Sequence, residues 1–347
     1  MEKTIIITGY GIVAKEFCKL IVDKAETIKD KYGFTLTVTG IIGSKGMIYQ
    51  QEGLDLQTLI EDEIGSNALI EYSKKKQVSF INPIYEADVL VECTPTNVEN
   101  GEPGLSYILE AIHAGADIVS VSKGALVHSF PLIKKVAANK ESRLKFSGAT
   151  AAALPTIDIG DDCLSGCTIT KIEGILNGTS NFILTSMNNE NISFEDALQI
   201  AKERGIAEAN PSLDIKGFDS AYKILLLANE LFGMDYTIKD VAIEGIEKLT
   251  SERMEEIAKR KKRVKLIASA YRENDQTILE VKPTELDENH PLFYVNGTNK
   301  GILFETEEMG TICATGGASH PKGAAAAALK DVINLYKNEA NTQLIRA

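Results

Sequence analysis

The segment from Thr4 to Ala14 constrains the fold more than any other part of the chain. Thr4–Thr8 is a short β-branched run, which predicts a buried strand of a parallel sheet. Gly9 and Gly11 follow at once, and after Ala14 apolar residues recur at helical spacing. A strand, a G-x-G-x-x-A turn and a helix together form the arrangement that binds a dinucleotide pyrophosphate. The alternative is a glycine turn that holds no ligand.

Strands and helices alternate over the first 150 residues. Further buried strands are expected at 35–42, 87–93 and 117–121, where Val, Ile and Thr are frequent. A helix is expected at 104–114, between the last two of these strands. This alternation predicts an α/β fold with a Rossmann-type, doubly wound parallel sheet over residues 1–150. At 347 residues the chain is long enough for a second domain.

The pattern changes after residue 150, and a second, α+β domain is expected over 151–315. One helix is expected over the apolar run 217–231. Two more are expected to start at pairs typical of helix N-termini, Ser193 with Asp196 and Thr237 with Asp240. Strand-like runs then follow one another directly: 263–271, 276–281, 301–305 and 310–314. A last helix, given the bounds 316–347 and with its alanine-rich helical pattern at about 322–336, joins the first domain.

The charge balance excludes several classes of function. Asp and Glu outnumber Lys and Arg by 49 to 37, so the formal net charge is −12, which disfavours binding to nucleic acids or anionic membranes. The basic run 259–263 follows several glutamates and is interpreted as the solvated end of a helix. No uncharged apolar run reaches the ~20 residues that a membrane span needs.

The cysteines indicate the compartment. Only Cys163 and Cys167 are close in sequence, and no second pair completes a zinc site. All five are therefore interpreted as free, mostly buried thiols of a cytoplasmic protein, and the N-terminus has no signal-peptide pattern.

The preferred dinucleotide is predicted from the end of the second strand, where an adenosine ribose would lie. The sequence there is Gly43-Ser44-Lys45-Gly46, without the Asp or Glu that would bind a free 2′-hydroxyl. The Ser44 hydroxyl and the Lys45 ammonium suit a 2′-phosphate better. NADP is therefore expected in preference to NAD.

Two further loops follow buried strands and should lie at the carboxyl end of the sheet. The first contains Thr94, and the second contains Ser122 and Lys123. Open α/β sheets bind ligands at this edge, so these residues are candidates for contact with a cofactor or a substrate oxygen. By its position alone, Lys123 could equally be a surface residue.

Residues 172–187 place a polar centre, Asn177 to Asn181, inside an apolar frame. Burying amide and hydroxyl groups is costly unless they bind one another or a ligand. Asn177 and Thr179 are therefore candidate substrate-binding residues.

Three carboxylates, Glu208, Asp214 and Asp219, precede Lys223 in the next segment. Asp219 and Lys223 are four residues apart, on one face of the expected helix. A lysine beside carboxylates can exchange a proton with a substrate oxygen, and carboxylates can bind a substrate ammonium. By spacing alone, the pair could also be an ordinary surface ion pair.

The blocks GILNGTSNFIL and GIAEANPSLDIKGFDSAYK resemble the signature of the homoserine dehydrogenase family. The chain is also similar to this family at VECTPTNVENGEPG, at Lys123 and in the glycine-rich approach to the final helix. The resemblance implies reversible hydride transfer between L-homoserine and L-aspartate 4-semialdehyde with NAD(P), in the biosynthesis of threonine and methionine. It also implies a homodimer formed through the second domain. No C-terminal regulatory domain is expected.

The resemblance assigns roles to individual residues. Lys223 matches the proton-transfer lysine, and Lys123 matches a second active-site lysine near the nicotinamide. Asp219 and Glu208 match carboxylates that hold homoserine, with Asp214 close behind. The cofactor-contact positions are matched by Ile12, Val13, Thr94, Ser122 and Gly317.

Several positions depart from the family pattern. Ser122 stands where the family usually has Asn, and Asn210 replaces an acid. The family loop that binds a monovalent cation normally opens with a glutamate, whereas residues 147–155 here contain none. Backbone carbonyls of this loop could still bind Na⁺, but the charge that would favour the ion is missing, so no metal ligand is assigned. These departures leave two alternatives: an oxidoreductase for a related amino or hydroxy acid, and a non-catalytic protein that senses a dinucleotide.

Overall fold

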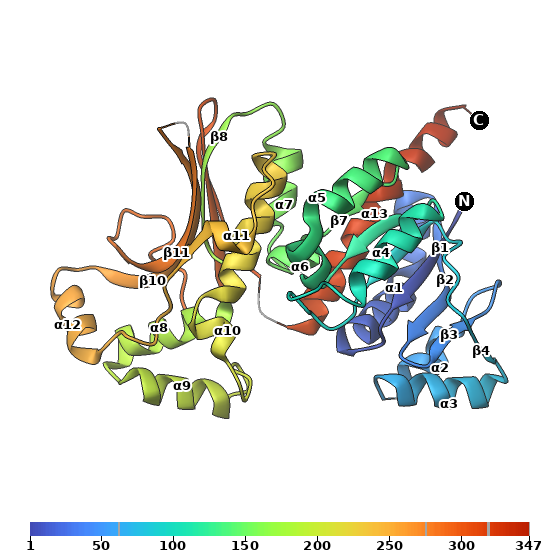
Figure 1. Ribbon diagram of the computed structural model, residues 1–347, viewed down its shortest axis with the longest axis horizontal. Coiled ribbons are helices and arrows are strands. Elements are labelled where there is room, and N and C mark those ends of the chain that lie inside the picture. The colour runs from blue at the N-terminus through green and yellow to red at the C-terminus, as the bar shows by residue number, and fades with distance from the viewer. Residues whose placement is uncertain (62, 275, 318–319, 347) are drawn as a thin grey trace. The chain divides into compact units, whose positions relative to one another are not determined.

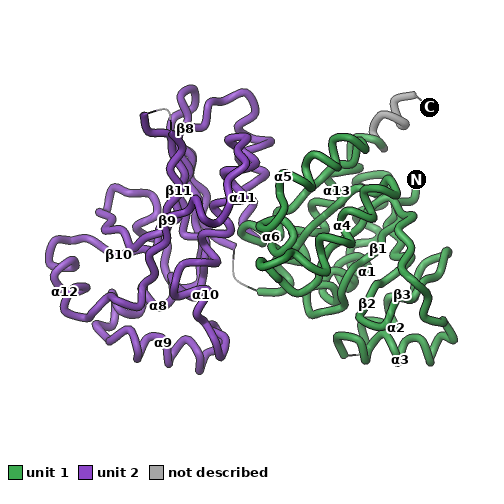
Figure 2. Tube along the Cα trace, in the orientation of Figure 1, with its two compact units in different colours: residues 1–152, 320–347 green, residues 153–319 purple. Residues whose placement is uncertain are grey.

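The chain forms two compact units in the computed structural model, which describes residues 1–61, 63–274, 276–317 and 320–346. Unit 1 comprises Met1–Ala152 and His320–Ala347, and unit 2 comprises Ala153–Ser319 (Figure 2). The C-terminal segment therefore returns to the unit that contains the N-terminus.

Within the described residues, the sheet of unit 1 has seven strands: β1 (Glu2–Thr8), β2 (Thr35–Gly43), β3 (Gly46–Tyr49), β4 (Phe80–Ile81), β5 (Val89–Glu92), β6 (Asp117–Ser120) and β7 (Leu144–Lys145). Their order is β4-β3-β2-β1-β5-β6-β7, and the five strands from β2 to β7 in this order run parallel. Central β1 buries Ile5, Ile6 and Ile7 completely. The predicted Rossmann-type α/β fold is confirmed.

An antiparallel edge, β3 and β4, extends this sheet and was not expected from the sequence. Gly43 of β2 pairs with Gly46 of β3, so Ser44 and Lys45 occupy the turn of a β-hairpin. Gly46 has φ +114°, and a Cβ on it would lie 2.8 Å from the Ile81 carbonyl oxygen. Only glycine allows β4 to approach this closely.

Helices cover the sheet of unit 1 (Figure 1): α1 (Ile12–Tyr32), α2 (Leu56–Glu61), α3 (Ser66–Lys76), α4 (Gly104–His113), α5 (Gly124–Asn139), α6 (Ser147–Thr150) and α13 (Pro321–Arg346). α13 packs beside α1, and their apolar side chains, such as Phe17 and Val332, belong to one core. The last helix is thus part of the hydrophobic core of unit 1.

Tyr336 attaches α13 to the sheet. Its single hydroxyl hydrogen is shared between two acceptors, the Asp88 carbonyl at 2.8 Å and the Asp117 carboxylate at 3.0 Å. The Lys3 ammonium lies 4.2 Å from the ring centre and the Arg143 guanidinium 5.0 Å from it. Burial and the nearby carboxylates raise the pKa of this phenol, so it remains a neutral donor.

The last helix starts at Pro321, close to residue 322 where the alanine-rich pattern predicts it, and later than residue 316, where the C-terminal segment begins. Residues Gly310–Gly316 form strand β13, and Gly316 and Gly317 have φ of +134° and +72°. These backbone angles are incompatible with a right-handed helix, whereas Pro321 suits a first helical turn.

In the part of unit 2 that the structure describes, the sheet has six strands: β8 (Ile169–Ile175), β9 (Val241–Ile243), β10 (Arg263–Glu273), β11 (Gln276–Leu286), β12 (Lys300–Thr306) and β13. Their order is β13-β12-β8-β10-β11-β9, and all pairs are antiparallel except β11 with β9. This second sheet confirms the predicted α+β character of the second half.

The helical segments of unit 2 are α7 (Thr156–Asp158), η1 (Ile159–Cys163), α8 (Gly178–Glu190), α9 (Phe194–Glu203), α10 (Ser212–Ile215), α11 (Phe218–Leu231), η2 (Ile238–Asp240) and α12 (Ser251–Lys259). Ser193 caps α9 by accepting the Asp196 N–H at 3.0 Å. Thr237 and Asp240 also form a capping box, but only one 3₁₀ turn follows, because β9 begins at Val241. The helix predicted there is wrong.

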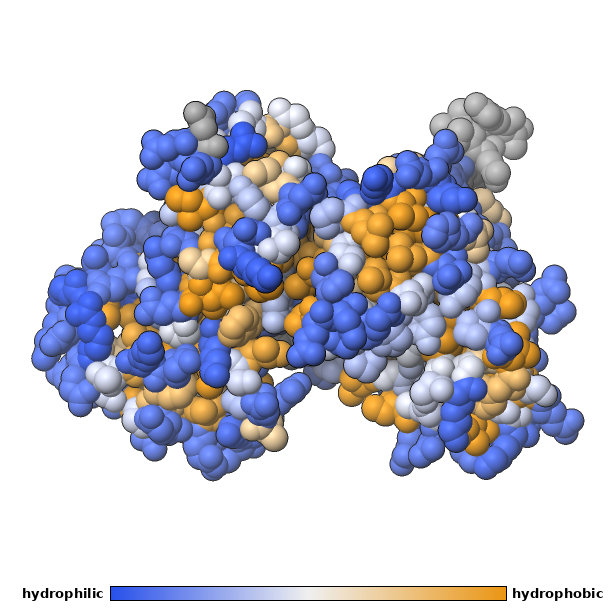
Figure 3. Space-filling model, in the orientation of Figure 1, coloured by the Kyte–Doolittle hydropathy of each residue, from blue (hydrophilic) through white to orange (hydrophobic). Residues whose placement is uncertain are grey.

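The basic run 259–263 lies at the end of α12, where hydrophilic residues cover the surface (Figure 3). Lys259 pairs with Glu255 at 3.0 Å, and Arg260 pairs with Glu285 at 2.8 Å. Acidic side chains thus balance part of this charge. Among the described residues, no helix combines the length and the apolar character required to cross a bilayer.

The prediction that the cysteines are mostly buried is wrong. All five are free, but only Cys18 is buried, whereas Cys163 and Cys313 are exposed. Cys163 ends the short η1 segment, and Cys313 lies on the edge strand β13, whose residues are half-buried or exposed.

Candidate active-site residues in the two units

Gly9 makes the turn between β1 and α1. Its φ is +78°, its N–H donates to the Ile42 carbonyl at 2.8 Å, and a Cβ on it would lie 2.8 Å from the Cys93 carbonyl oxygen. The left-handed backbone and the two neighbouring strand ends therefore require glycine at this position.

Gly11 has a different role from Gly9. Its φ is −84°, and a Cβ built on it would meet no atom within 4 Å. Gly11 is the N-cap of α1 without a side-chain cap, so it leaves the N-terminal amides of the helix open to an anionic ligand. The turn therefore has the space and the donors that a pyrophosphate needs.

A cavity of about 460 Å³ surrounds this turn within unit 1. Among the predicted cofactor residues it is lined by Gly9, Gly11, Ile12, Val13, Ser44 and Thr94. The folded chain thus gathers three loops that follow β1, β2 and β5. Lys45, Ser122 and Lys123 are not among its lining residues.

Ser44 and Lys45 are both exposed at the hairpin turn that follows β2. The Ser44 and Ser66 hydroxyl oxygens are 2.6 Å apart. The residues that line the cavity, as far as the structure describes them, include no carboxylate. A free ribose 2′-hydroxyl would therefore lack the usual acidic partner on this wall.

Glu92, at the end of β5, is a buried residue that the sequence reasoning missed. Its carboxylate accepts hydrogen bonds from the Thr94 N–H at 2.8 Å, from the Thr94 hydroxyl, and from the Ser120 hydroxyl at 2.9 Å. Burial raises the pKa of this carboxyl. Glu92 hydrogen-bonds to the loops that follow β5 and β6. The sequence signal that could have identified it is an acidic residue at the end of the apolar run VLVE.

Lys123 directly precedes α5, and its carbonyl accepts the Val127 N–H at 2.8 Å. The neighbouring Ser122 hydroxyl lies 3.3 Å from that of Thr96. A Cβ on Gly124 would lie 2.6 Å from the backbone of Asn97, so the loops after β5 and β6 are in close contact. The side chains of Ser122 and Lys123 are therefore carried by a tightly packed pair of loops.

Lys223, in unit 2, is buried within α11 although it is a lysine. Its ammonium donates to the Leu176 carbonyl at 2.7 Å and to the Asp219 carboxylate at 2.5 Å. The pair has side-chain exposures of only 11% and 15%, so it is not an ordinary surface ion pair. Burial makes each charge depend on its partner.

Asn177 connects this pair to a second carboxylate. Its amide nitrogen donates to Asp214 at 2.6 Å and to Asp219 at 2.8 Å, while its amide oxygen caps α8 by accepting the Ser180 N–H at 2.8 Å. Burial and then the charge of Asp219 raise the pKa of Asp214. Four of the predicted residues thus form one hydrogen-bonded cluster.

Two other predicted substrate residues, Glu208 and Thr179, have other surroundings than the cluster of Lys223, Asp219, Asn177 and Asp214. Glu208 is exposed, and its negative charge helps to raise the pKa of Asp214. The Thr179 hydroxyl donates to the Ile206 carbonyl at 3.1 Å, which fixes the backbone two residues before Glu208.

The predicted cofactor residue Gly317 lies in unit 2 beside Leu154, and a Cβ on it would approach the Leu154 nitrogen to 2.8 Å.

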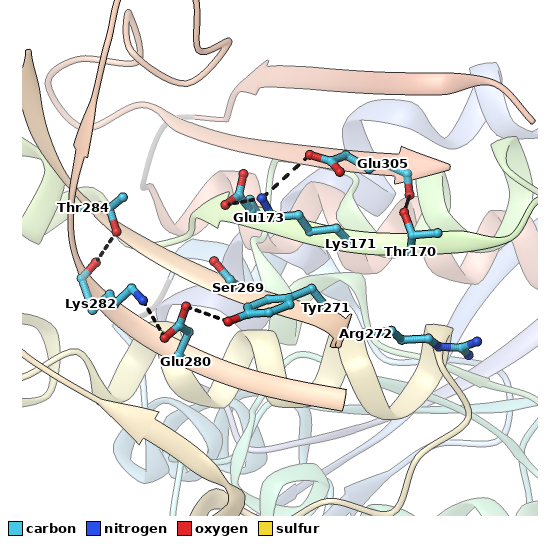
Figure 4. Close-up of a pocket in the computed structure, with 10 residues that line it drawn as sticks. All are labelled: Thr170, Lys171, Glu173, Ser269, Tyr271, Arg272, Glu280, Lys282, Thr284 and Glu305. Carbon is cyan, nitrogen blue, oxygen red and sulfur yellow. Dashed lines mark hydrogen bonds and ion pairs between the residues drawn. The ribbon is translucent and has the colours of Figure 1, made fainter. Parts of the chain in front are cut away.

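One face of the unit 2 sheet carries a polar pocket of about 410 Å³ that the sequence reasoning did not identify (Figure 4). Lys171 lies 3.0 Å from Glu173 and 3.7 Å from Glu305, and Lys282 lies 2.7 Å from Glu280. These side chains come from β8, β11 and β12 and point to the same face. Among the described residues, no group of three or more His, Cys, Asp or Glu side chains is arranged so that it could hold a metal ion.

Comparison with known proteins identifies the family. A family model described as homoserine dehydrogenase matches residues 155–333, and one described as homoserine dehydrogenase, NAD binding domain matches residues 9–146. A homoserine dehydrogenase of Methanocaldococcus jannaschii is 36% identical over 96% of this chain and 98% of its own length. The chain belongs to the homoserine dehydrogenase family. The family expected from the sequence blocks is confirmed.

Two further comparisons support this family. An NAD(+)-dependent homoserine dehydrogenase of Pseudomonas canavaninivorans is 30% identical over 99% of this chain and 98% of its own length. A crystal structure of a homoserine dehydrogenase homologue from Archaeoglobus fulgidus matches with a TM-score of 0.83 at 28% identity, covering 96% of this chain and 99% of the other. The protein is thus an oxidoreductase that acts on a CH–OH group of a small molecule with a nicotinamide dinucleotide.

The two glycines of the turn should respond differently to replacement by alanine. Gly9→Ala should lower the free energy of unfolding by about 1–2 kcal/mol or more, because alanine resists the left-handed backbone and meets the Cys93 carbonyl. Gly11→Ala should change stability by less than about 0.5 kcal/mol but weaken dinucleotide binding, because its methyl group enters the cavity. Urea unfolding and calorimetric titration measure the two effects. Unchanged binding by Gly11→Ala would show that the pyrophosphate lies elsewhere.

Proposed function

We propose that the protein catalyses reversible hydride transfer between L-homoserine and L-aspartate 4-semialdehyde, with Lys223 as proton donor and acceptor. The observation that carries this proposal is the hydrogen-bonded cluster of Lys223, Asp219, Asn177 and Asp214, of which Lys223 and Asn177 are buried. It combines an amine able to exchange a proton with carboxylates able to hold a substrate ammonium. Membership of the homoserine dehydrogenase family supports the same substrate pair.

Lys223 is held where its proton can be used. The Leu176 carbonyl and the Asp219 carboxylate accept two of the three hydrogen bonds that an ammonium can donate. Held by these two acceptors, the side-chain nitrogen is the group that we propose exchanges a proton with the substrate oxygen. During alcohol oxidation the amine takes the hydroxyl proton, and in the reverse direction the ammonium gives a proton to the aldehyde oxygen. The bound nicotinamide dinucleotide accepts or supplies the hydride.

The carboxylates provide the binding site for the amino group of the substrate. Asn177 holds Asp214 and Asp219 within hydrogen-bonding distance of one amide, where their like charges repel. A substrate ammonium beside them would offset this repulsion, and exposed Glu208 adds further negative charge nearby. Thr179 contributes indirectly, because its hydroxyl orders the segment that leads to Glu208.

The cofactor residues of unit 1 complete the proposal. Gly9, Gly11, Ile12, Val13 and Thr94 would hold the dinucleotide in the cavity that they line. Ser122 and Lys123 would contact it near the nicotinamide, from the loop after β6. Gly317 is proposed as a further contact because it matches a family position.

We infer a preference for NADP from Ser44 and Lys45. Both side chains are exposed at the end of β2, and no described carboxylate lines the cavity beside them. A hydroxyl and an ammonium there suit a 2′-phosphate. NAD is the competing cofactor, because the relative from Pseudomonas canavaninivorans is NAD(+)-dependent.

We also infer that two copies of the chain form a homodimer through the polar face of the unit 2 sheet. Lys171, Glu173 and Tyr271 on this face alternate along their strands with buried Ile172 and Ala270. The face carries positive and negative side chains together (Figure 4). Such a surface can be complementary to itself, as a two-fold interface requires.

Replacing Lys223 tests the catalytic proposal. Lys223→Ala should lower kcat with L-homoserine by about 10²-fold or more, because the proton-transfer group is lost, and should leave cofactor affinity nearly unchanged. Lys223→Met preserves the buried packing if alanine destabilises the fold. Lys216→Ala, an exposed lysine seven residues earlier, is the matched control and should retain normal turnover. Steady-state kinetics of cofactor reduction measure all three.

The outcomes separate the hypotheses. Near-normal turnover by both Lys223 variants refutes its role as proton donor. Turnover of another alcohol by the wild type, without turnover of homoserine, supports the alternative substrate. Dinucleotide binding without any turnover supports the sensing protein.

Ser44→Asp should shift the cofactor preference toward NAD. The new carboxylate would repel a 2′-phosphate and accept a hydrogen bond from a free 2′-hydroxyl. The ratio of kcat/KM for the two cofactors measures this shift. No change in the ratio would mean that Ser44 does not face the ribose, and a wild-type preference for NAD of tenfold or more would overturn the NADP assignment.

Lys171→Glu should dissociate the proposed homodimer, because it places a third carboxylate beside Glu173 and Glu305. Lys259→Glu, an exposed position on α12, is the control and should leave the dimer intact. Sedimentation velocity reports the mass of each variant. A monomeric wild type would contradict the dimer itself, and a dimeric Lys171→Glu would contradict this interface.

A further inference from the structure

Ser147 opens the loop to which the family resemblance assigns a monovalent cation, in the place where the family normally carries a glutamate. In this chain Ser147 is buried at the start of α6, beside α13 (Figure 1). Its N–H donates to one oxygen of Asp331 at 2.9 Å, and its hydroxyl donates to the other at 2.8 Å. A fully buried carboxylate from the last helix thus stands at the loop.

Lys330, the neighbour of Asp331, supplies the matching positive charge. Its ammonium lies 2.9 Å from the Asp331 carboxylate and donates to the Ser147 hydroxyl oxygen at 2.8 Å. The Lys330 side chain is 34% exposed, whereas Asp331 is not exposed at all. The loop from residue 147 therefore has an anion and a cation, and both come from α13.

These residues do not fit an additional Na⁺ or K⁺. Such ions require several oxygen atoms with free lone pairs and no competing cation. Here the Ser147 hydroxyl and the Asp331 carboxylate already bind an ammonium, and the Ser147 carbonyl accepts the Thr150 hydroxyl at 3.1 Å. A second cation at this position would be repelled by Lys330 at close range.

We propose that Lys330 replaces the monovalent cation of the family in this chain, with Asp331 in place of the missing loop glutamate. The charge that orders residues 147–152 is then covalently part of the protein. The loop remains ordered at any sodium or potassium concentration. This inference concerns metal binding and stability, so it does not depend on the proposed catalytic role of Lys223.

The wild type gives the direct test. Sodium is titrated against the full-length protein at constant ionic strength, with tetramethylammonium as the replaced ion. Sodium NMR line width and the melting temperature are the two readouts. The expected result is no saturable binding and no shift in melting temperature, and saturable sodium binding would overturn the proposal.

Lys330→Met tests the replacement itself, with Lys337→Met on the same helix as the matched control. Lys337 interacts with the side chain of Asn334, its neighbour on the helix, and its variant should melt like the wild type. Lys330→Met leaves buried Asp331 without its cation, so its melting temperature should fall by roughly 5 °C or more. Added sodium should recover part of this loss. A Lys330→Met protein that melts like Lys337→Met, or that does not respond to sodium, would overturn the proposal, and if this variant does not fold, the wild-type titration decides.

Discussion

A lysine ammonium buried in unit 2 sets a constraint that several elements satisfy together. Lys223 on α11 needs partners, because an isolated charge in the interior is costly. Leu176, just after β8, provides a carbonyl, and Asp219, one helical turn earlier, provides a carboxylate. Asn177 then holds Asp219 and Asp214 with one amide while it caps α8. The hydrogen bonds of this one charge therefore extend to the end of β8, to the start of α8 and to two acidic residues.

In unit 1 the main constraint is the close approach of loops at the carboxyl end of a parallel sheet. Gly9 lets β1 turn into α1 against the Cys93 carbonyl, and Gly11 keeps the cavity open. The Glu92 carboxylate accepts hydrogen bonds from both Thr94 and Ser120 and so connects the ends of two strands. The C-terminal helix completes the same unit, because Tyr336 holds it to the sheet and Asp331 holds the loop at Ser147. The cofactor cavity thus rests on contacts between segments from both ends of the chain.

Some elements of this fold are predictable from the sequence and others are not, for physical reasons. The buried strands and the helix capped by Ser193 were predictable because apolar periodicity and capping are local properties. The β3–β4 edge was missed because β4 has two residues and depends on the approach that Gly46 allows. The helix expected after Thr237 ends after one turn because Val241 pairs with β11. The burial of Glu92 and the polar face of the unit 2 sheet were not predicted, because burial depends on the elements that pack around a residue and not on its neighbours in sequence.

By itself, the sequence determined the family, the glycine turn and the set of residues able to exchange protons or hold an ammonium, because these follow from residue types at short spacing. Tertiary structure alone decided which of them meet. It joined Asn177 to Asp214 and Asp219 but left Glu208 exposed, and it brought Lys330 to Ser147 across 183 positions of the chain. Contacts of this kind depend on how helices pack on a sheet, and spacing along the chain carries no record of that packing.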